Sequence, residues 1–595
     1  MATISLGRYM WERIRQVGVE TIFGVPGDFN LQFLDSIFEV DGLKWIGNQN
    51  ELNAAYAADG YARIKGVPGV FVTTHGVGEL SALNGVAGAM SEHVKLIHVV
   101  GQTTRLMQDK HMMIHHSIGR EPNHQQYNNA SKGLRYAAAE LWDIKTAPQE
   151  IDRVIRECFI QSGPVYIFMP LDLSAEQVST DLLKTPIDFS PKVDTVAQGK
   201  AVEAILAALS SSKNPSVFID ALAHRFNAVS ESRELVKKLH IPFYSSNMGK
   251  GVVDETEEMY VGNWNGPISS PGVDEAAQQS DLVITFGYLP ADTNSGGFAR
   301  KLESDKSVIV NPFNVVVKGT IYPDTSLKPL LSALIKSLPS HPQQKVSKPI
   351  LPPPRTPLDI AATNITQSYL WPRISEFLTP GDILLADTGT TVFGLCDIPF
   401  PENVRFTTQI YYGSIGWATP ATLGVDVARK EISNEGRTIL ITGDGSLALT
   451  IQEIGTMIKQ KSSAIIFVIN NEGYTVERMI WGAQQPYNDI VPTTYSHLLP
   501  LYQHPTPSTS YHLATTKVEL DSLLSSPALL NPPNLQLVEI VVPKLDTSWR
   551  LAGQLAYRGE AAKEYLNNEG FVNTYGDWGL GAVEGGEGKT GVKWT

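Results

Sequence analysis

The stretch Thr438-Ile-Leu-Ile-Thr-Gly443-Asp444-Gly445-Ser446 decides how this chain folds. It joins a β-rich run to a glycine turn, and a helical pattern leads from there to a second apolar run that ends in Asn470-Asn471. Twenty-four residues, 446–469, separate Gly445 from Asn470. Two parallel strands need a crossover of a dozen or more residues, usually a helix. The stretch therefore predicts a strand–helix–strand unit of an open parallel α/β sheet.

The turn around Asp444 has the chemistry of a site for a metal-bound diphosphate. Ligands bind at the carboxyl ends of parallel strands, and both Asp444 and Asn471 fall at such ends. The glycines let backbone N–H groups approach a phosphate, and the helix that follows directs its positive end there. Mg²⁺ prefers hard oxygen ligands in an octahedral array. One carboxylate and one amide oxygen meet that preference.

A simpler interpretation treats Gly-Asp-Gly as an ordinary turn and Asn-Asn as a strand end, but the combined pattern is much less common by chance. The combination resembles the signature of the thiamine-diphosphate enzymes, which is GDG, a spacer of this length and NN. The resemblance implies that Asp444, Asn471 and the backbone carbonyl of Gly473 hold Mg²⁺ on the diphosphate. It also implies that the cofactor-binding turns include Gly445, Ser446, Tyr474 and Thr475.

The same resemblance assigns a carboxylate to the cofactor's aminopyrimidine. In the family, one glutamate drives this ring into its imino form, and the ring then takes the proton from the thiazolium carbon C2. The matching stretch runs from Gly47 to Gly60, and Glu51 is its carboxylate. Glutamate is seldom buried, so a solvated helix residue is the alternative. The run Ala-Ala-Tyr-Ala-Ala beside it favours a close-packed helix and the functional interpretation.

Two further stretches match the family's cofactor contacts. In Gly413-Ser414-Ile415, the isoleucine would hold the thiazolium folded over the pyrimidine, and the glycine carbonyl would accept from the amino group. Thr388-Gly389-Thr390 matches the segment that flanks the pyrimidine.

Three other features indicate decarboxylation of a 2-oxo acid, and they make the chain most similar to the pyruvate decarboxylases of fungi. They are Asp28 after Gly24-Val-Pro-Gly27, the pair His115-His116, and Glu477. Decarboxylation on the cofactor ylid leaves an enamine, which must be protonated near neutral pH before aldehyde leaves. The resemblance implies that Asp28, His115 and His116 form a proton relay and that Glu477 contacts the departing carboxylate. Which group donates the proton stays open, because their titrations are coupled.

Because 595 residues exceed one hydrophobic core, two or three domains are expected. Three blocks of alternating strands and helices are visible, and they indicate three open, mainly parallel α/β domains. A pyrimidine-binding domain is predicted at 1–180, a central domain at 195–340 and a diphosphate-binding domain at 358–560. A C-terminal tail is assigned to 561–595, and loose order is expected within it from Phe571 onward. Linkers are predicted at 173–199 and in the proline-rich stretch 339–357. The expected elements include the strands Thr21–Val25, Val70–Thr74, Leu96–Val100, Val165–Met169, Ser216–Ile219, Leu282–Phe286, Ile383–Ala386, Thr438–Thr442 and Ile465–Asn470, and a helical segment 548–567.

Composition narrows the possible partners and compartment. The formal net charge is −13, and no stretch is a run of Lys or Arg, which argues against nucleic acid or an anionic membrane surface. The cysteines Cys158 and Cys396 are expected to be reduced thiols. No signal peptide and no apolar run of 18 residues is visible. We therefore expect a cytoplasmic protein that acts on a small molecule.

The resemblance covers roughly the first 560 residues, and it implies conversion of pyruvate to acetaldehyde and CO₂. In such enzymes Glu51 of one chain serves the Mg²⁺ that another chain holds, so a dimer or, more often, a tetramer is expected. Carboligation to an acyloin is one alternative, although the acetolactate synthases lack the Asp28 and His-His set. An inactive regulatory paralogue is another, and the intact Glu51, Asp444 and Asn471 argue against it.

Several departures from the pattern put the size of the substrate in doubt. Thr293 stands where the family usually has phenylalanine, Val476 replaces an isoleucine, and Trp481 replaces a residue that is often histidine. Val392 lies where bacterial members have tryptophan. A pocket that accepts 2-oxo acids larger than pyruvate is the resulting alternative.

Overall fold

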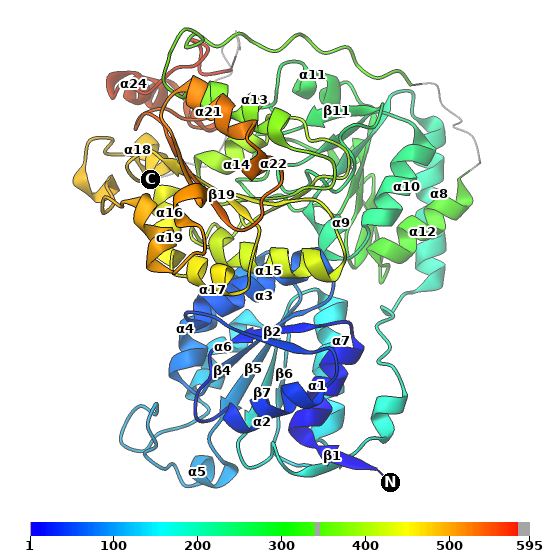
Figure 1. The fold of residues 1–595 in the computed structure, drawn as a ribbon. Coiled ribbons are helices and arrows are strands. Elements are labelled where there is room, and N and C mark those ends of the chain that lie inside the picture. The colour runs from blue at the N-terminus through cyan, green and yellow to red at the C-terminus, as the bar shows by residue number, and fades with distance from the viewer. Residues whose placement is uncertain (1, 339–345, 581–595) are drawn as a thin grey trace. The chain divides into compact units, whose positions relative to one another are not determined.

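The computed structural model describes residues 2–338 and 346–580. The chain divides into two compact units, which we describe separately (Figure 1). Unit 1 comprises Met1–Pro191, Tyr412–Glu435 and Thr450–Ser462. Unit 2 comprises Lys192–Tyr411, Gly436–Leu449 and Ser463–Thr595.

Unit 1 is built on a six-stranded sheet in which every pair of neighbouring strands is parallel. Strands β4, β5 and β7 are buried along their whole length, as their continuous apolar sequences require, because helices cover both faces of such sheets. In spatial order the strands are β3 (Lys44–Gly47), β2 (Thr21–Gly24), β4 (Gly69–Thr74), β5 (Leu96–Gln102), β7 (Pro164–Pro170) and β6 (Ala137–Glu140).

Helices α3 (Glu51–Lys65) and α15 (Ala418–Glu431) form the closest helix pair of unit 1 and lie side by side in Figure 1. A Cβ on Gly60 would lie 2.2 Å from the carbonyl oxygen of Ala421, and one on Gly424 would lie 1.8 Å from that of Ala57. Only glycine permits this approach. The other helices of the unit are α1 (Leu6–Gln16), α2 (Leu31–Asp35), α4 (Val77–Ser91), α5 (Arg105–Asp109), α6 (Gln126–Ser131), α7 (Ala147–Gln161) and α17 (Glu453–Lys459).

Unit 2 contains two sheets, and the first is seven-stranded and mixed. Its strands are parallel as far as β13, and an antiparallel hairpin then extends the edge. In spatial order they are β11 (Tyr260–Asn263), β10 (Phe243–Ser245), β9 (Pro215–Ile219), β12 (Leu282–Phe286), β13 (Ser307–Val310), β14 (Asn314–Val317) and β15 (Thr320–Pro323). The helices of this region are α8 (Thr195–Ser211), α9 (Ala221–Arg225), α10 (Val229–Leu239), α11 (Val273–Gln278) and α12 (Leu327–Ser337).

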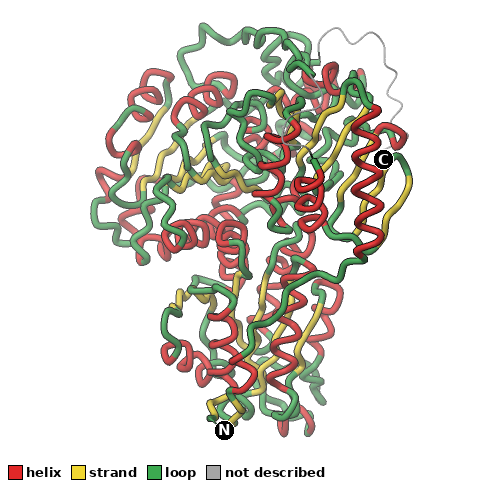
Figure 2. The backbone as a smooth tube through the Cα atoms, turned by 90° about the vertical axis from the view of Figure 1, so that its right-hand side faces the viewer, coloured by secondary structure: helices red, strands yellow, loops and turns green. Residues whose placement is uncertain are grey.

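The second sheet of unit 2 has six strands, all parallel, with helices on both sides (Figure 2). In spatial order they are β17 (Arg405–Thr408), β16 (Ile383–Ala386), β18 (Thr438–Gly443), β19 (Ile465–Asn470), β21 (Gln536–Val541) and β20 (Tyr511–Ala514). The helices are α13 (Gln367–Phe377), α14 (Thr390–Leu395), α16 (Asp444–Thr450), α18 (Thr475–Ile480), α19 (Leu498–Leu501), α20 (Pro507–Ser510), α21 (Lys517–Leu524), α22 (Pro527–Leu530), α23 (Trp549–Ala556) and α24 (Glu560–Asn568).

These three sheets confirm the predicted α/β fold class, with two local corrections. The expected linker 173–199 contains the short strand β8 (Gln177–Ser179), which pairs with β1 (Thr3–Ser5), and α8 already begins at Thr195. The helical segment expected at 548–567 is two helices, because Gly559 breaks it with a φ of 131°. The last part of the expected tail, 581–595, lies outside the described residues. Among the described helices, none combines the length and hydropathy needed to cross a membrane.

Candidate active site

In unit 2, three neighbouring strands of the parallel sheet end beside one another and bring their following residues together. Gly443 pairs with Ile469 at the ends of β18 and β19, and β16 lies on the other side of β18. Asp444, Asn471 and Thr388 follow these three strands. The predicted position of Asp444 and Asn471 at adjacent carboxyl ends is therefore confirmed.

Asp444 is almost completely buried and organises the turn that follows β19. Its Oδ1 accepts from the backbone N–H of Gly445 at 2.7 Å. Its Oδ2 accepts from the N–H groups of Asn471 and Gly473, both at 3.1 Å. Burial raises the pKa of Asp444 to about 6, against the lowering effect of these N–H groups. Because burial disfavours the ionised carboxylate, a bound cation would stabilise its charged form.

The amide of Asn471 is held in one orientation. Its Nδ2 donates to Thr475 Oγ1 at 2.8 Å, and that hydroxyl donates to the carbonyl of Lys544 at 3.2 Å. The amide oxygen is therefore directed away from Thr475. The residues between them form a tight turn in which Glu472 has a φ of 59° and Gly473 a φ of 129°.

The residues of this sheet edge fit a diphosphate with its metal. A Cβ built on Gly389 or Gly443 meets no described atom within 4 Å, so there is space for a ligand beside the backbone at both positions. Gly445 lies directly against the ring of Tyr474, since a Cβ on it would be 2.6 Å from that ring. Carboxylate, amide and backbone oxygens are the donor set that Mg²⁺ takes.

Glu477 lies one helical turn after Gly473, in the first turn of α18. Its side chain stays accessible to solvent, yet partial burial of the carboxyl group raises its pKa above the ordinary value. Trp481 follows α18 and stacks on Tyr565 of α24, with ring centroids 6.0 Å apart.

Unit 1 carries the other predicted residues, and Glu51 is the first residue of α3. Its Oε1 lies against Gly78 at the start of α4, where an added Cβ would be 3.3 Å away. The preceding loop is fixed by Glu453, a fully buried carboxylate on α17. Glu453 accepts from Asn48 Nδ2 at 2.9 Å and from Asn53 Nδ2 at 2.8 Å. Sequence reasoning missed this clamp, because 400 residues separate Asn53 from Glu453.

The stretch Gly413-Ser414-Ile415 also belongs to unit 1, and Gly413 has a φ of 69°. The hydroxyl of Ser414 is 2.8 Å from Tyr56 Oη and accepts from Asn84 Nδ2 at 2.9 Å. These contacts hold the stretch against α3, which begins with Glu51, and against α4, whose Gly78 lies next to the Glu51 carboxylate.

The structure brings the three residues of the predicted relay together at the carboxyl edge of the unit 1 sheet. His115 Nε2 is 2.7 Å from Asp28 Oδ2, and both side chains are more than half exposed. The rings of His115 and His116 are 4.7 Å apart, and one ligand atom from each of the three residues lies within 4.8 Å of the others. Phe29 stacks under His115 at 5.0 Å. His116 has a φ of 69°, and its carbonyl accepts from Tyr127 Oη at 2.5 Å.

Two buried titratable groups next to this relay were not predicted. His75 follows β4, and its Nδ1 is 3.6 Å from Glu79 Oε1. Burial lowers the pKa of His75 to about 4 and raises that of Glu79 to about 8. The position of His75 at a strand end was the only signal in the sequence, and many loop histidines share it.

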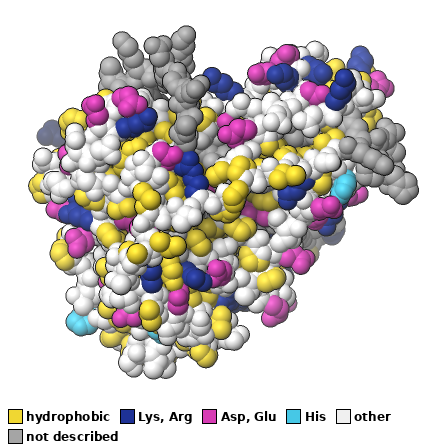
Figure 3. Space-filling view, turned by 90° about the horizontal axis from the view of Figure 1, so that it is seen from above, with side chains coloured by type: hydrophobic (Ala, Val, Ile, Leu, Met, Phe, Trp, Pro, Cys, Tyr) yellow, Lys and Arg dark blue, Asp and Glu magenta, His cyan; other side chains and the backbone are white. Residues whose placement is uncertain are grey.

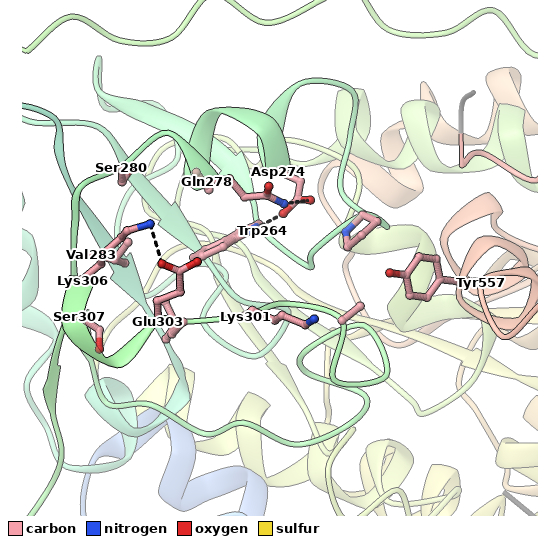
Figure 4. Close-up of a pocket in the computed structure, with 14 residues that line it drawn as sticks. Trp264, Asp274, Gln278, Ser280, Val283, Lys301, Glu303, Lys306, Ser307 and Tyr557 are labelled. Atoms are coloured by element: carbon pink, nitrogen blue, oxygen red, sulfur yellow. Dashed lines mark hydrogen bonds and ion pairs between the residues drawn. The ribbon is translucent and has the colours of Figure 1, made fainter. Parts of the chain in front are cut away.

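A cavity of about 350 Å³ lies elsewhere in unit 2, at the amino ends of β12 and β13 (Figure 4). Its polar groups are largely paired: Trp264 and Gln278 donate to Asp274, and Lys306 lies 2.6 Å from Glu303. Ligands of open α/β sheets bind at the carboxyl ends, so this cavity is not the cofactor site.

Comparisons with known proteins agree with this chemistry. Models of three thiamine pyrophosphate enzyme domains match the chain; thiamine pyrophosphate is another name for thiamine diphosphate. The N-terminal TPP binding domain matches residues 4–126, the central domain 202–336 and the C-terminal TPP binding domain 387–505.

Curated relatives match nearly the whole chain. Pyruvate decarboxylase isozyme 1 of Saccharomyces cerevisiae is 39% identical over 558 residues, which cover 93% of this chain and 98% of the relative. The pyruvate decarboxylases of Candida glabrata and Kluyveromyces lactis are 40% and 39% identical, with the same coverage. The chain therefore belongs to the thiamine-diphosphate-dependent 2-oxo acid decarboxylases, carboxy-lyases that work with this cofactor and Mg²⁺.

Proposed function

We propose that this enzyme converts pyruvate to acetaldehyde and CO₂. The observation that carries the proposal is the Asp28–His115–His116 cluster, which supplies the proton that an aldehyde product requires. The printed activity of the fungal relatives supports the same substrate.

In this proposal the unit 2 edge holds the cofactor. Asp444, Asn471 and the carbonyl of Gly473 hold Mg²⁺, and Gly445, Ser446, Tyr474 and Thr475 surround the diphosphate. Thr388, Gly389 and Thr390 flank the pyrimidine. When bound, thiamine diphosphate supplies the carbon nucleophile and the electron sink for loss of CO₂.

The residues at the carboxyl edge of the unit 1 sheet hold and move protons in this proposal. Glu51 holds a proton on a pyrimidine nitrogen, and Asn50 supports it by capping α3 through its contact with the Asn53 N–H at 2.8 Å. Gly413, Ser414 and Ile415 fix the ring geometry of the cofactor.

The relay then completes the reaction. His115 Nε2 exchanges a proton with Asp28 Oδ2, and His115, alone or with His116, would supply the proton that the aldehyde product needs. Glu477 would contact the departing carboxylate, and partial burial raises its pKa, which favours its protonated form.

The deciding test is product analysis with purified protein, pyruvate, Mg²⁺ and thiamine diphosphate. We expect acetaldehyde and CO₂ in equal amounts. Acetolactate as the main product would favour the carboligase, and no turnover of any 2-oxo acid would favour the inactive paralogue. His115→Gln with His116→Gln should slow aldehyde release, and full activity in that double variant would reject the relay.

A second candidate is a decarboxylase for larger 2-oxo acids, and the observation that favours it is the placement of Thr293. Its hydroxyl donates to the carbonyl of Ile410 at 2.9 Å, so this small side chain is anchored to the backbone. Val392 is fully buried, and Trp481 is 70% exposed. A wider pocket then requires that no other side chain fills the space that a phenyl ring would take in place of Thr293.

We also propose a homo-oligomer in which Glu51 of one chain serves the metal site of another. Exposed apolar side chains next to the relay and Glu51 supply a surface for such contact, namely Val77, Leu80, Met112, Met113 and Ile118. A cytoplasmic location is proposed from Cys158 and Cys396, which are buried, unpaired thiols. On the face that Figure 3 shows, Lys and Arg lie interspersed with Asp and Glu, which suits a small-molecule enzyme. The domain boundaries given above stay predictions.

A further inference from the structure

One buried charge near the metal-binding turn has no assigned role. Arg478 lies on α18 and is completely buried. Its Nη1 donates to the carbonyl of Ala483 at 2.7 Å. A buried guanidinium is costly unless its donors are bonded. Nη1 and Nη2 are bonded, whereas Nε has no hydrogen-bond partner among the described residues, so the charge calls for an explanation.

The second nitrogen, Nη2, reaches the metal-binding turn directly. It donates to the carbonyl of Glu472 at 3.1 Å and to that of Asn488 at 2.9 Å, and it pairs with Asp489 Oδ1 at 2.6 Å. The carbonyl of Glu472 and the N–H of Gly473 belong to one peptide group. Since that N–H donates to Asp444 Oδ2 at 3.1 Å, Arg478 and Asp444 hold this peptide plane from its two sides.

The next peptide plane is fixed through the same guanidinium. The N–H of Tyr474 donates to the carbonyl of Asn488 at 2.9 Å, and this is the oxygen that also accepts from Arg478. In a trans peptide the C=O points opposite to the N–H. The carbonyl of Gly473 is therefore directed away from Asn488, where it accepts from the N–H of Thr475 at 3.1 Å. Its direction depends both on this contact and on where Arg478 holds the Asn488 carbonyl.

Further contacts run along one side of the turn as a chain, called the belt below, from Arg478 through Asp489, Lys544 and Thr475 to Asn471. Asp489 Oδ1 also pairs with Lys544 Nζ at 2.9 Å, and the carbonyl of Lys544 accepts from Thr475, which holds the Asn471 amide. The belt thus links two of the proposed metal ligands, Asn471 and Gly473. Hydrogen bonds from Lys544 and Arg478 hold the pKa of Asp489 below its usual range.

We propose that Arg478 is a positioning residue for the metal site: it orients the Gly473 carbonyl through both adjoining peptide planes and so sets the affinity for Mg²⁺. The proposal rests on the metal role of Gly473 given above. A lysine at this position keeps the charge, but one ammonium cannot reproduce the planar fork that joins the Ala483 carbonyl to those of Glu472 and Asn488.

The test measures metal binding without turnover. Apoenzyme with saturating thiamine diphosphate is titrated with Mn²⁺ and followed by the EPR signal of the free ion, in wild type, Arg478→Lys and Arg550→Lys. Arg550 is the matched control, because it is also buried in unit 2 and bonds a carbonyl, that of Ile268, and a carboxylate, Asp397. We expect Arg478→Lys to raise the Kd for Mn²⁺ about 10–100-fold. Arg550→Lys should leave the Kd unchanged.

A wild-type Kd for Mn²⁺ in a folded Arg478→Lys protein overturns the proposal. An equal rise of the Kd in Arg550→Lys also overturns it, because the effect would then come from a general loss of packing in unit 2. If Arg478→Lys does not fold, Asn488→Ala provides a second route. Its side chain holds the loop through the carbonyls of Trp481 and Gly482, and its loss should raise the Kd in the same direction. Asp444→Asn distinguishes a failure of the metal site from a failure of the role of Arg478. Retained Mn²⁺ affinity in Asp444→Asn rejects the metal site itself. Lost affinity in Asp444→Asn, together with wild-type affinity in Arg478→Lys, rejects only the role of Arg478.

Discussion

Glu79→Gln should remove much of the pH dependence of the stability of unit 1. Glu79 is 2% exposed, and its Oε1 accepts from the N–H of Gly76 at 2.9 Å, which caps α4. Its Oε2 has no hydrogen-bond partner among the described residues. Glutamine has the shape of the protonated acid and retains the acceptor for Gly76, so the variant should fold normally.

The magnitude follows from the pKa of Glu79, which burial raises from 4.5 to about 8. Between these values the folded protein keeps a proton that the unfolded chain has lost, so stability falls as pH rises and levels off above about pH 8. At about 1.4 kcal/mol for each pH unit, wild type should lose ~4 kcal/mol more than the variant between pH 5 and pH 9. The buried carboxyl groups of unit 2 titrate in both proteins and cancel in the comparison.

The assay is hydrogen–deuterium exchange of peptides that cover β4, α4 and β5, because a chain of this size need not unfold in one step. The free energy of opening is compared between the two proteins at both pH values, with exposed Glu121→Gln as a control that should follow wild type. A difference between wild type and Glu79→Gln that stays constant with pH would show that Glu79 is ionised in the folded protein, and would refute the reasoning.

Three other predictions concern the site. Glu51→Gln should lower kcat by at least ~100-fold while thiamine diphosphate, followed by fluorescence titration, binds within about threefold of wild type; near-normal turnover would remove its role. Prolonged chelation at mildly alkaline pH should give inactive apoenzyme that only Mg²⁺ and cofactor together restore, and recovery in metal-free buffer would contradict the metal assignment. Thr293→Phe should lower kcat/KM for phenylpyruvate relative to pyruvate by roughly tenfold, within the ~1–3 kcal/mol that a pocket contact can contribute; an unchanged ratio means that other residues close the pocket.

The buried parallel strands were predictable almost to the residue. Leu282–Phe286, Ile383–Ala386 and Ile465–Asn470 have the bounds expected from sequence, because strands covered on both faces form continuous apolar runs that polar residues end abruptly. The hairpin β14–β15 was not predicted, since an edge strand with one solvated face has a weaker pattern. The break at Gly559 was also missed, as glycine within a helical pattern is often tolerated.

The site was predictable where motif and strand end coincide. Asp444 and Asn471 lie at neighbouring strand ends, as the βαβ spacing requires. Glu453 and Arg478 were not identified, because each acts through contacts with loops whose position only the fold determines. His75 and Glu79 were missed for a related reason: their altered pKa values come from burial, which sequence does not specify for a single polar residue.

The close contact between α3 and α15 has a practical consequence for dissecting this protein. The gene segment for residues 1–191 encodes the whole sheet of unit 1 but omits α15 and α17, which come from 412–435 and 450–462. A fragment cut at residue 191 would leave the alanine-rich face of α3 in water and Glu453's partners Asn48 and Asn53 without their carboxylate. Such a fragment should express as aggregates, whereas a fusion that restores the two helices through short linkers should be soluble. Boundaries for expression are therefore better chosen from contacts than from the order of the sequence.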